Sequence, residues 1–364
     1  MSRGAIATIW VDALKHNYSR IQQLIDDRSI LAMVKSNGYG HGLTRVARAL
    51  SRADAFGVAA VDEAIILREA GMGQPIVVMA GFYDNEEIAL FSHYQLSAVV
   101  HHPEQLTALE KQKLSTPLNI WLKIDTGMHR LGFPPDQVST AYRRLQACTA
   151  VAKPIGLMTH LADADNVGRE FTQMQIERFN QVCKNLIGVK SIVNSAGILS
   201  HREALAHWVR PGIMLYGVSP LPGRTGKEEG LLPVMTLTAK VIAIKNLRQG
   251  DKIGYGCQWS CPEDMPVGIV GIGYGDGYPR HAVNGTPTLV NKKRCLLVGR
   301  VSMDMIAIDL RPCPHASVGD RVVLWGEDLP VETIAACAGT IPYELLCRVT
   351  PRVEFVDAHH DEKK

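Results

Sequence analysis

One lysine stands where an amine could do chemistry. In the segment AMVKSNGYGHG, residues 32–42, Lys35 ends an apolar run and is followed by three glycines around Tyr39 and His41. A positive charge at the end of a buried strand needs a reason, and an uncharged lysine amine forms a Schiff base with an aldehyde. Lys35 is therefore the first candidate for a reacting group.

Further candidates also stand at the ends of apolar runs. They are Lys123, Asp125, Arg130, His160, Asn194, Ser195, Arg210, Gly212 and Ile213. The Ser195 hydroxyl, and the free N–H groups of a helix that opens at SAG, favour an anion such as a phosphate. Gly212 lets backbone amides come close to such a ligand. A phosphate together with a Schiff-base lysine indicates pyridoxal phosphate.

Two other interpretations of Lys35 remain open at this point. The amine could react directly with a substrate carbonyl, as in an aldolase, or it could only pair with Asp125. The spacing of the residues does not separate these alternatives.

These residues need a scaffold that brings strand ends together. Short apolar runs, each followed by a helix-like pattern, occupy residues 29–35, 55–61, 75–81, 96–102, 119–125, 155–161, 190–196 and 209–217. Continuous apolar strands indicate a parallel sheet covered on both faces. Eight such units predict a (β/α)₈ barrel, whose active site lies at the C-terminal ends of the strands. A doubly wound open sheet is the alternative.

A change of texture marks a second domain. Residues 215–233 are rich in proline, glycine and charge, and strand-like runs dominate after them. We predict the barrel over residues 1–228 and a C-terminal, mainly β domain over residues 229–364. Residues 1–10 supply a spare strand ahead of the barrel that could pair with the β domain.

The composition excludes several classes of protein. The chain has 364 residues, of which 46% are hydrophobic and 21% charged, and a formal charge of only +3, which gives no support for nucleic-acid or membrane binding. Neither a signal peptide nor a membrane span is expected. The eight scattered cysteines predict reduced thiols in a cytoplasmic protein, with no disulfide framework and no metal site.

A set of motifs follows the order of one known family across nearly the whole chain. After AMVKSNGYGHG come LKIDTGMHRLGF (122–133), MTHLADAD (158–165), VNSAG (193–197), VRPGIMLYG (209–217), GYGCQW (254–259), GYGDGYPR (273–280), GRVSMDM (299–305) and YELLCRVTPRV (343–353). These segments resemble the alanine racemases, a pyridoxal-phosphate-dependent family with a (β/α)₈ barrel and a C-terminal β domain.

The resemblance implies a role for each matching residue. Lys35 would hold the cofactor and act as the base on the D-alanine side, and Tyr255 would be the base on the L-alanine side. Arg210 would face the pyridine nitrogen, with His160 behind it. The phosphate-side contacts would be Tyr39, Asn194, Ser195, Gly212, Ile213 and Tyr343.

The substrate side follows from the same resemblance. Arg130 and the backbone of Met303 would hold the substrate carboxylate, and Lys123 matches a position that is often carbamylated and orients Arg130. The approach would be lined by Tyr274, Arg280 and Asp304. The chain departs from the usual pattern at Ser36, Gly38, His129 and Ser302, and none of these changes removes a reacting group.

The implied activity is the interconversion of L- and D-alanine by two bases, either to supply D-alanine for peptidoglycan or in alanine catabolism. The implied assembly is a homodimer in which the β domain of one subunit completes the barrel site of the other. Alternatives are a racemase of broader specificity, a related pyridoxal-phosphate amino-acid decarboxylase and a non-catalytic cofactor-binding protein. Arg210 and Tyr255 disfavour the decarboxylase, and the β domain disfavours the binding protein.

Overall fold

The protein consists of two compact units. A computed structural model describes residues 4–166, 168 and 170–360. The barrel unit comprises Asn17–Leu215 and Pro220–Pro222, and the β unit comprises the described residues of Met1–His16, Tyr216–Ser219 and Gly223–Lys364. The predicted limits at residues 228 and 229 stay a prediction. Residues 4–16 belong to the same compact unit as the C-terminal part of the chain.

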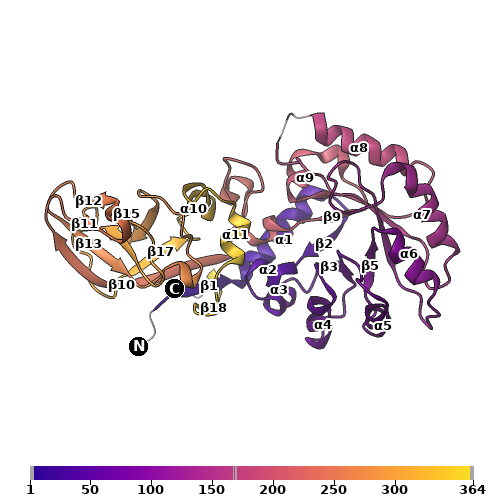
Figure 1. Ribbon diagram of the computed structural model, residues 1–364, viewed down its shortest axis with the longest axis horizontal. Helices are drawn as coiled ribbons and strands as arrows, with labels where there is room; N and C mark the ends of the chain where they lie inside the picture. The colour runs from indigo at the N-terminus through magenta and orange to yellow at the C-terminus, as the bar shows by residue number, and fades with distance from the viewer. Residues whose placement is uncertain (1–3, 167, 169, 361–364) are drawn as a thin grey trace. The chain divides into compact units, whose positions relative to one another are not determined.

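The barrel unit is built on a closed ring of parallel strands (Figure 1). The strands are β2 (Ser29–Met33), β3 (Ala55–Val58), β4 (Ile76–Val78), β5 (Ser97–Val100), β6 (Ile120–Lys123), β7 (Gly156–Met158), β8 (Lys190–Asn194) and β9 (Trp208–Arg210). Seven of the eight apolar runs contain one of these strands, and the run 209–217 begins one residue after the start of β9. The strands close into a ring, so the predicted (β/α)₈ barrel is confirmed and the open sheet is excluded.

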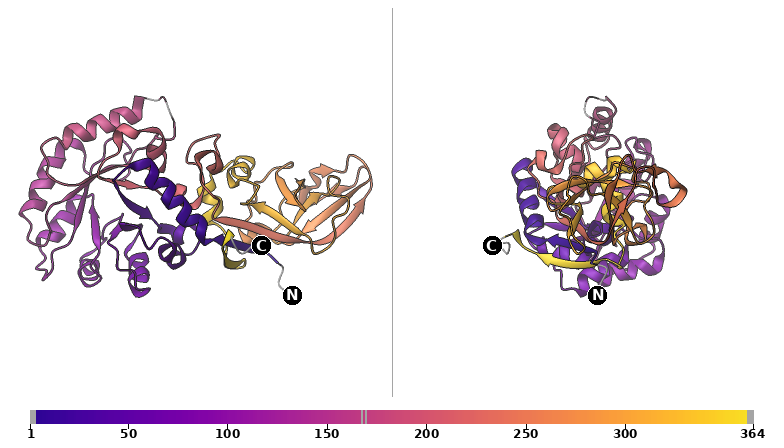
Figure 2. Two further views of the ribbon diagram at one scale, coloured as in Figure 1. Left: turned by 180° about the vertical axis from the view of Figure 1, so that it is seen from behind. Right: turned by 90° about the vertical axis from the view of Figure 1, so that its left-hand side faces the viewer.

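Helices cover the outside of this ring, as seen from both sides in Figures 1 and 2. They are α1 (Val11–Ile25), α3 (Leu43–Ala49), α4 (Val61–Glu69), α5 (Asn85–His93), α6 (Pro103–Glu110), α7 (Pro135–Ala147), α8 (Glu170–Val182) and α9 (Ser195–Ser200). The short segment α2 (Lys35–Tyr39) follows β2 and has left-handed backbone angles inside it. α1 begins in the β unit and continues into the barrel unit.

Apolar side chains fill the ring from strands that are not neighbours. Trp121 of β6 meets Trp208 of β9 edge to face, with ring centroids 6.2 Å apart. Because β6 pairs only with β5 and β7, this contact crosses the barrel. Gly156 of β7 makes room for it, since a Cβ there would lie against the Trp121 ring. Such close packing holds the strand ends in fixed positions.

The β unit contains an eight-stranded sheet in the order β13-β16-β15-β14-β17-β10-β1-β18, with β13 also paired to β10. Its strands are β1 (Ile6–Trp10), β10 (Met235–Leu247), β13 (Met265–Val270), β14 (Pro287–Val290), β15 (Lys293–Val298), β16 (Ile306–Asp309), β17 (Arg321–Trp325) and β18 (Glu354–Ala358). β1 pairs antiparallel with β10 and parallel with β18. The expected mainly β domain is thus confirmed.

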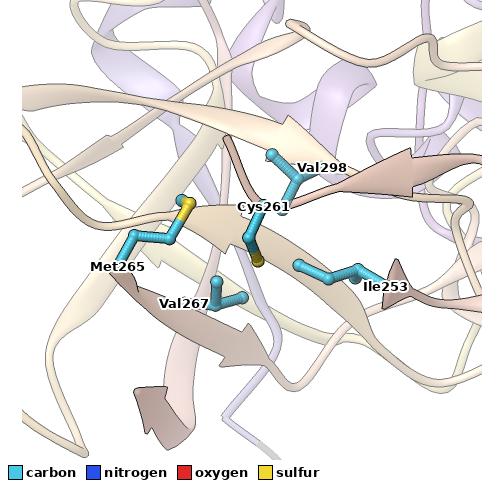
Figure 3. Packing of buried hydrophobic residues seen from close by; sticks show 5 residues of the cluster. All are labelled: Ile253, Cys261, Met265, Val267 and Val298. Atoms are coloured by element: carbon cyan, nitrogen blue, oxygen red, sulfur yellow. The ribbon is translucent and has the colours of Figure 1, made fainter. Parts of the chain in front are cut away.

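Smaller elements complete the β unit. β11 (Lys252–Ile253) and β12 (Trp259–Ser260) form a short two-stranded ribbon, and α10 (Val331–Cys337) and α11 (Pro342–Cys347) precede β18. Figure 3 shows the apolar cluster beneath the ribbon, formed by Ile253, Cys261, Met265, Val267 and Val298. Ile253 and Cys261 flank the ribbon's connecting turn, so this cluster anchors both sides of that turn.

All eight cysteines are free thiols. No helix within residues 4–166, 168 and 170–360 has the length and apolar character needed to cross a bilayer.

Candidate active site

Lys35 opens a turn of unusual handedness directly after β2. The next residues have left-handed backbone angles, with φ of 56° at Ser36, 53° at Asn37, 62° at Gly38 and 51° at Tyr39. Only glycine takes up this conformation without cost, and three of these four residues have side chains. Such strain persists only where the surroundings fix the backbone.

The surroundings of this turn do fix it. The imidazole of the fully buried His41 donates from Nδ1 toward the carbonyls of Tyr39, at 2.9 Å, and Gly38, at 3.2 Å. Burial lowers the pKa of His41 to about 4, so the ring is neutral at physiological pH. Asn37 Oδ1 accepts from the Leu43 N–H at 2.8 Å, and Glu63 accepts from the Asn37 N–H. Lys35 is therefore held at the rim by a preformed turn.

A second group of residues gathers at the ends of β8 and β9. The Ser195 hydroxyl oxygen accepts from the Gly212 N–H at 2.8 Å, and Asn194 Oδ1 caps α9 by accepting from the Gly197 N–H at 3.0 Å. A Cβ on Gly212 would collide with the Tyr39 hydroxyl. Gly212 thus lies against both Ser195 and Tyr39, and the buried Ile213 follows directly. Of the predicted phosphate contacts, only Tyr343 lies in the other unit, on α11.

Arg210 is a buried cation with fixed acceptors. It donates to Ser191 Oγ, to the Thr159 carbonyl and to the Ile192 carbonyl, and its Nη2 lies 3.3 Å from His160 Nδ1. Burial lowers the pKa of Arg210 to about 10, and the group therefore stays charged at neutral pH. No hydrogen bond of its Nε occurs among the described residues. That donor is therefore available to a ligand.

Four cations influence one another at this rim. Burial and the charges of Arg210, Arg130 and Lys35 lower the pKa of Lys123 to about 8, against a smaller opposing effect of Asp125. Burial and the same positive surroundings hold the pKa of His160 well below its usual range. Like charges gather in this way where a protein binds anions.

Arg130 is carried by a loop that Asp125 organises. Asp125 Oδ1 accepts from the N–H groups of Gly127 and His129, each at 3.0 Å, and its N–H donates to the Phe133 carbonyl at 2.9 Å. The His129 ring lies 3.1 Å from Asp125 Oδ2. These bonds fold the loop back on the end of β6 and place Arg130 beside Lys123.

In the β unit, Tyr255 sits on the turn between β11 and β12. Gly254 and Gly256 on either side have φ of 71° and 74°, which suit glycine. Arg300 supports the turn by donating from Nε to Gln258 Oε1 at 2.8 Å. The Tyr255 side chain is 70% exposed. A rigid turn thus presents an exposed phenol within its own unit.

The remaining predicted residues form a second group in the β unit. The Tyr274 N–H donates to the Ser302 carbonyl at 3.0 Å, and the Gly275 N–H donates to the Met303 carbonyl at 2.9 Å. This pairing brings Tyr274, Met303 and Asp304 together, and Arg280 follows in the segment after the one-turn helix Tyr274–Asp276. The predicted residues therefore fall into one set in the barrel unit and one set in the β unit.

Sequence reasoning missed three residues that shape these sets. His41 was given no role, although it holds the turn after Lys35. Asp276 and Arg352 lie within quoted motifs but were not singled out, and both contact the segments around Met303. An acid in GYGDGYPR and an arginine in VTPRV were the available signals, but no local pattern joins segments that far apart in the chain.

Comparison with known proteins agrees over both units. The family model described as "Alanine racemase, N-terminal domain" matches residues 9–220, and "Alanine racemase, C-terminal domain" matches residues 234–356. A Coxiella burnetii protein named alanine racemase is 59% identical over 358 residues, covering 97% of this chain and 98% of that protein. A Nitrosococcus oceani alanine racemase is 52% identical over 95% of this chain and 97% of its own length.

Solved structures give the same result. The biosynthetic alanine racemase from Pseudomonas aeruginosa superposes with a TM-score of 0.96 at 40% identity, covering 99% of this chain and 100% of that one. The alanine racemase from Acinetobacter baumannii has a TM-score of 0.93 at 36% identity, covering 98% and 99%. Because the matches cover both the barrel unit and the β unit, the chain belongs to the alanine racemase family.

Proposed function

We propose that Lys35 and Tyr255 are the two bases with which this chain exchanges the α-proton of alanine. The activity is that of an alanine racemase, the interconversion of L- and D-alanine, with pyridoxal 5′-phosphate as cofactor. Of the observations, the one that carries the assignment of Lys35 is its place on a rigid turn at a cation-rich barrel rim.

The residues of the barrel rim fit the cofactor. Ser195, the Gly212 N–H and Tyr39 make a close polar group, and a side chain on Gly212 would fill it. This group would hold the phosphate together with Asn194 and Ile213, and Tyr343 is proposed to join them. Arg210 has an Nε donor directed by its other bonds and would bind the pyridine nitrogen.

The chemistry of the residues follows from these positions. When bound, the cofactor withdraws electrons from the substrate and so acidifies its α-hydrogen. Lys35 would take that proton from D-alanine and Tyr255 would take it from L-alanine, each returning a proton when the reaction runs the other way. Because the guanidinium of Arg210 can only donate, it would leave the pyridine nitrogen unprotonated, whereas a carboxylate would accept from a protonated nitrogen. His160, kept neutral, accepts from Arg210 and steadies it.

Substrate binding is assigned to Arg130 and to the backbone of Met303. A planar guanidinium suits a carboxylate, and the Asp125 loop fixes where Arg130 stands. The lowered pKa of Lys123 makes its neutral amine available to carbon dioxide, which supports the proposal that this lysine is carbamylated and then orients Arg130 as an anion. Tyr274, Arg280 and Asp304 would line the approach.

We further propose a homodimer in which the β unit of each subunit completes the site of the other. Tyr255 is 70% exposed and Met303 is 52% exposed, and tyrosine and methionine are both enriched in subunit interfaces. A cytoplasmic location fits eight free thiols. For the cell, the proposed role is the supply of D-alanine for peptidoglycan, with alanine catabolism as the alternative.

Isotope exchange tests the assignment of the two bases. In deuterated water, Tyr255→Phe should still exchange the α-hydrogen of D-alanine through Lys35 but should form almost no L-alanine. Tyr83→Phe is the matched control, because Tyr83 is also exposed, at 74%, and belongs to the barrel unit. If Tyr255→Phe racemises at the rate of the control, Tyr255 is not a base.

A further inference from the structure

A buried carboxylate holds the loops around Met303 together. Asp276 is fully buried, and its Oδ2 accepts from the Gly273 N–H at 3.0 Å. Its Oδ1 lies 3.4 Å from Nε of Arg352. A buried charge needs such partners, because a carboxylate removed from water without them is costly.

Arg352 reaches a second carboxylate from the same side chain. Its Nη2 donates to Asp304 Oδ1, while its Nε faces Asp276. The hydrogen bond that Arg352 donates to Asp304 and the negative charge of Asp276 raise the pKa of Arg352 above its ordinary value. One guanidinium therefore bridges the segment of Asp276 and the segment of Met303 and Asp304.

Hydrogen bonds of the backbone join the same three segments, those of Gly275, Met303 and Thr350. The Thr350 N–H donates to the Asp276 carbonyl at 3.1 Å, and the Thr350 hydroxyl donates to the Gly275 carbonyl at 3.0 Å. Gly275 in turn donates to the Met303 carbonyl, and a Cβ on Gly275 would collide with the Arg352 guanidinium. The guanidinium of Arg352 thus lies directly against Gly275, whose N–H binds the Met303 carbonyl.

We propose that Arg352 is a positioning residue for substrate binding, which fixes the backbone of Met303 by clamping Asp304 to the buried Asp276. This inference rests on the proposed function, in which the Met303 backbone holds the substrate carboxylate. A lysine cannot replace the clamp, because a single ammonium cannot present two fixed donors in the directions of two carboxylates. The clamp acts on binding, since it touches neither proposed base.

The test uses the full-length holoenzyme and compares Arg352→Gln and Arg352→Lys with the wild type. Because the carboxylate is common to both enantiomers, we expect KM for L- and D-alanine to rise together, by about tenfold for Arg352→Gln, with kcat within about twofold. The KM of Arg352→Lys should lie between that of the wild type and that of Arg352→Gln. Propionate has the carboxylate of alanine but no amino group, and its inhibition constant should rise by the same factor as KM.

The matched control is Arg348→Gln. Arg348 is an exposed arginine four residues earlier, and it pairs with Glu344 at 2.9 Å rather than with the Met303 segment. This variant should keep the wild-type KM and propionate constant. If Arg352→Gln lowers the melting temperature and leaves both constants unchanged, Arg352 is only structural and the inference is wrong. If Arg352→Gln does not fold, Arg352→Lys decides by the same constants.

One further variant separates this inference from the proposed function beneath it. Arg130→Ala should abolish propionate inhibition if Arg130 anchors the carboxylate as proposed. Loss in Arg130→Ala with no change in either Arg352 variant would overturn the clamp and leave the substrate site standing. Retention of propionate binding in Arg130→Ala would overturn the substrate site itself.

Discussion

Arg210 and His160 share one hydrogen bond, 3.3 Å long, in which the guanidinium donates and the neutral imidazole accepts. The direction matters, because a protonated imidazole would repel the arginine that it now supports. Burial and four neighbouring charges of positive sign keep it neutral. The barrel thus stabilises the buried cation Arg210 by keeping the neighbouring His160 unprotonated.

Replacing Arg210 by glutamate should change which reaction follows proton removal. Arg210→Glu places a group that can share a proton at the pyridine nitrogen and leaves the Thr159 and Ile192 carbonyls without their donor. Racemisation should fall by about a hundredfold, and the ratio of pyruvate to racemised alanine should rise. Arg210→Lys, which still lacks an acceptor, is the control, and an unchanged ratio in the glutamate variant contradicts this account.

Mixing two inactive variants should restore activity if sites are shared between subunits. Lys35→Ala and Tyr255→Ala chains each lack one proposed base. After subunit exchange, half of the dimers are mixed and each carries one intact site, so up to about a quarter of the wild-type activity should return. Exchange is checked with differently tagged chains. Confirmed mixed dimers without activity would mean that each chain builds its own site.

The stability of the protein should fall in mild acid because of His41. Its pKa is about 4 in the folded protein and near 6.5 in the unfolded chain, so the unfolded state binds more protons between these values. Stability should therefore decline as the pH falls from 6.5 toward 4, by about 3 kcal/mol from this residue alone. His41→Gln should have lower stability at pH 7 and a shallower dependence in denaturant titrations. An equal slope in both proteins would show that His41 titrates normally.

Adding one methyl group at Gly212 should weaken cofactor binding. In Gly212→Ala the new Cβ meets the Tyr39 hydroxyl and must displace it from the group around Ser195. The pyridoxal phosphate needed for half-maximal activity should rise by about tenfold. Gly73→Ala is the control, because nothing lies within 4 Å of its Cβ. Removing the hydroxyl as well, in Gly212→Ala with Tyr39→Phe, should recover part of the affinity, and no recovery would place the clash elsewhere.

The barrel was predictable from the sequence because each strand is written in consecutive residues. Runs such as 29–35 and 190–196 form strands that are covered on both faces of the sheet. Their apolar character can be recognised from consecutive residues, without knowledge of distant contacts. The left-handed turn after Lys35 was not predictable, since Ser36, Asn37 and Tyr39 have no local preference strong enough to announce it. The contacts of the buried His41 and of Asn37 help to fix that conformation.

Residues that act through distant partners were the hardest to find. Asp276 and Arg352 lie close together because two distant segments of the β unit fold beside each other. Neither motif contains a local pattern that predicts this contact. The role of Tyr255 came from the family resemblance, and the structure adds that its turn stands on an apolar cluster. Site residues that follow a strand end could therefore be predicted from the sequence. Those that are brought together by tertiary contacts alone could not.

The pairing of β1 also dictates an order of events during synthesis. β1 leaves the ribosome before any barrel strand, yet its two neighbours, β10 and β18, follow about 225 and 345 residues later. At ordinary translation rates this delay lasts on the order of tens of seconds. The barrel strands, which end at Arg210, are complete before either neighbour exists. The residues of β1 therefore lack both of their strand partners through most of elongation, and β1 can pair only after the barrel strands have been made.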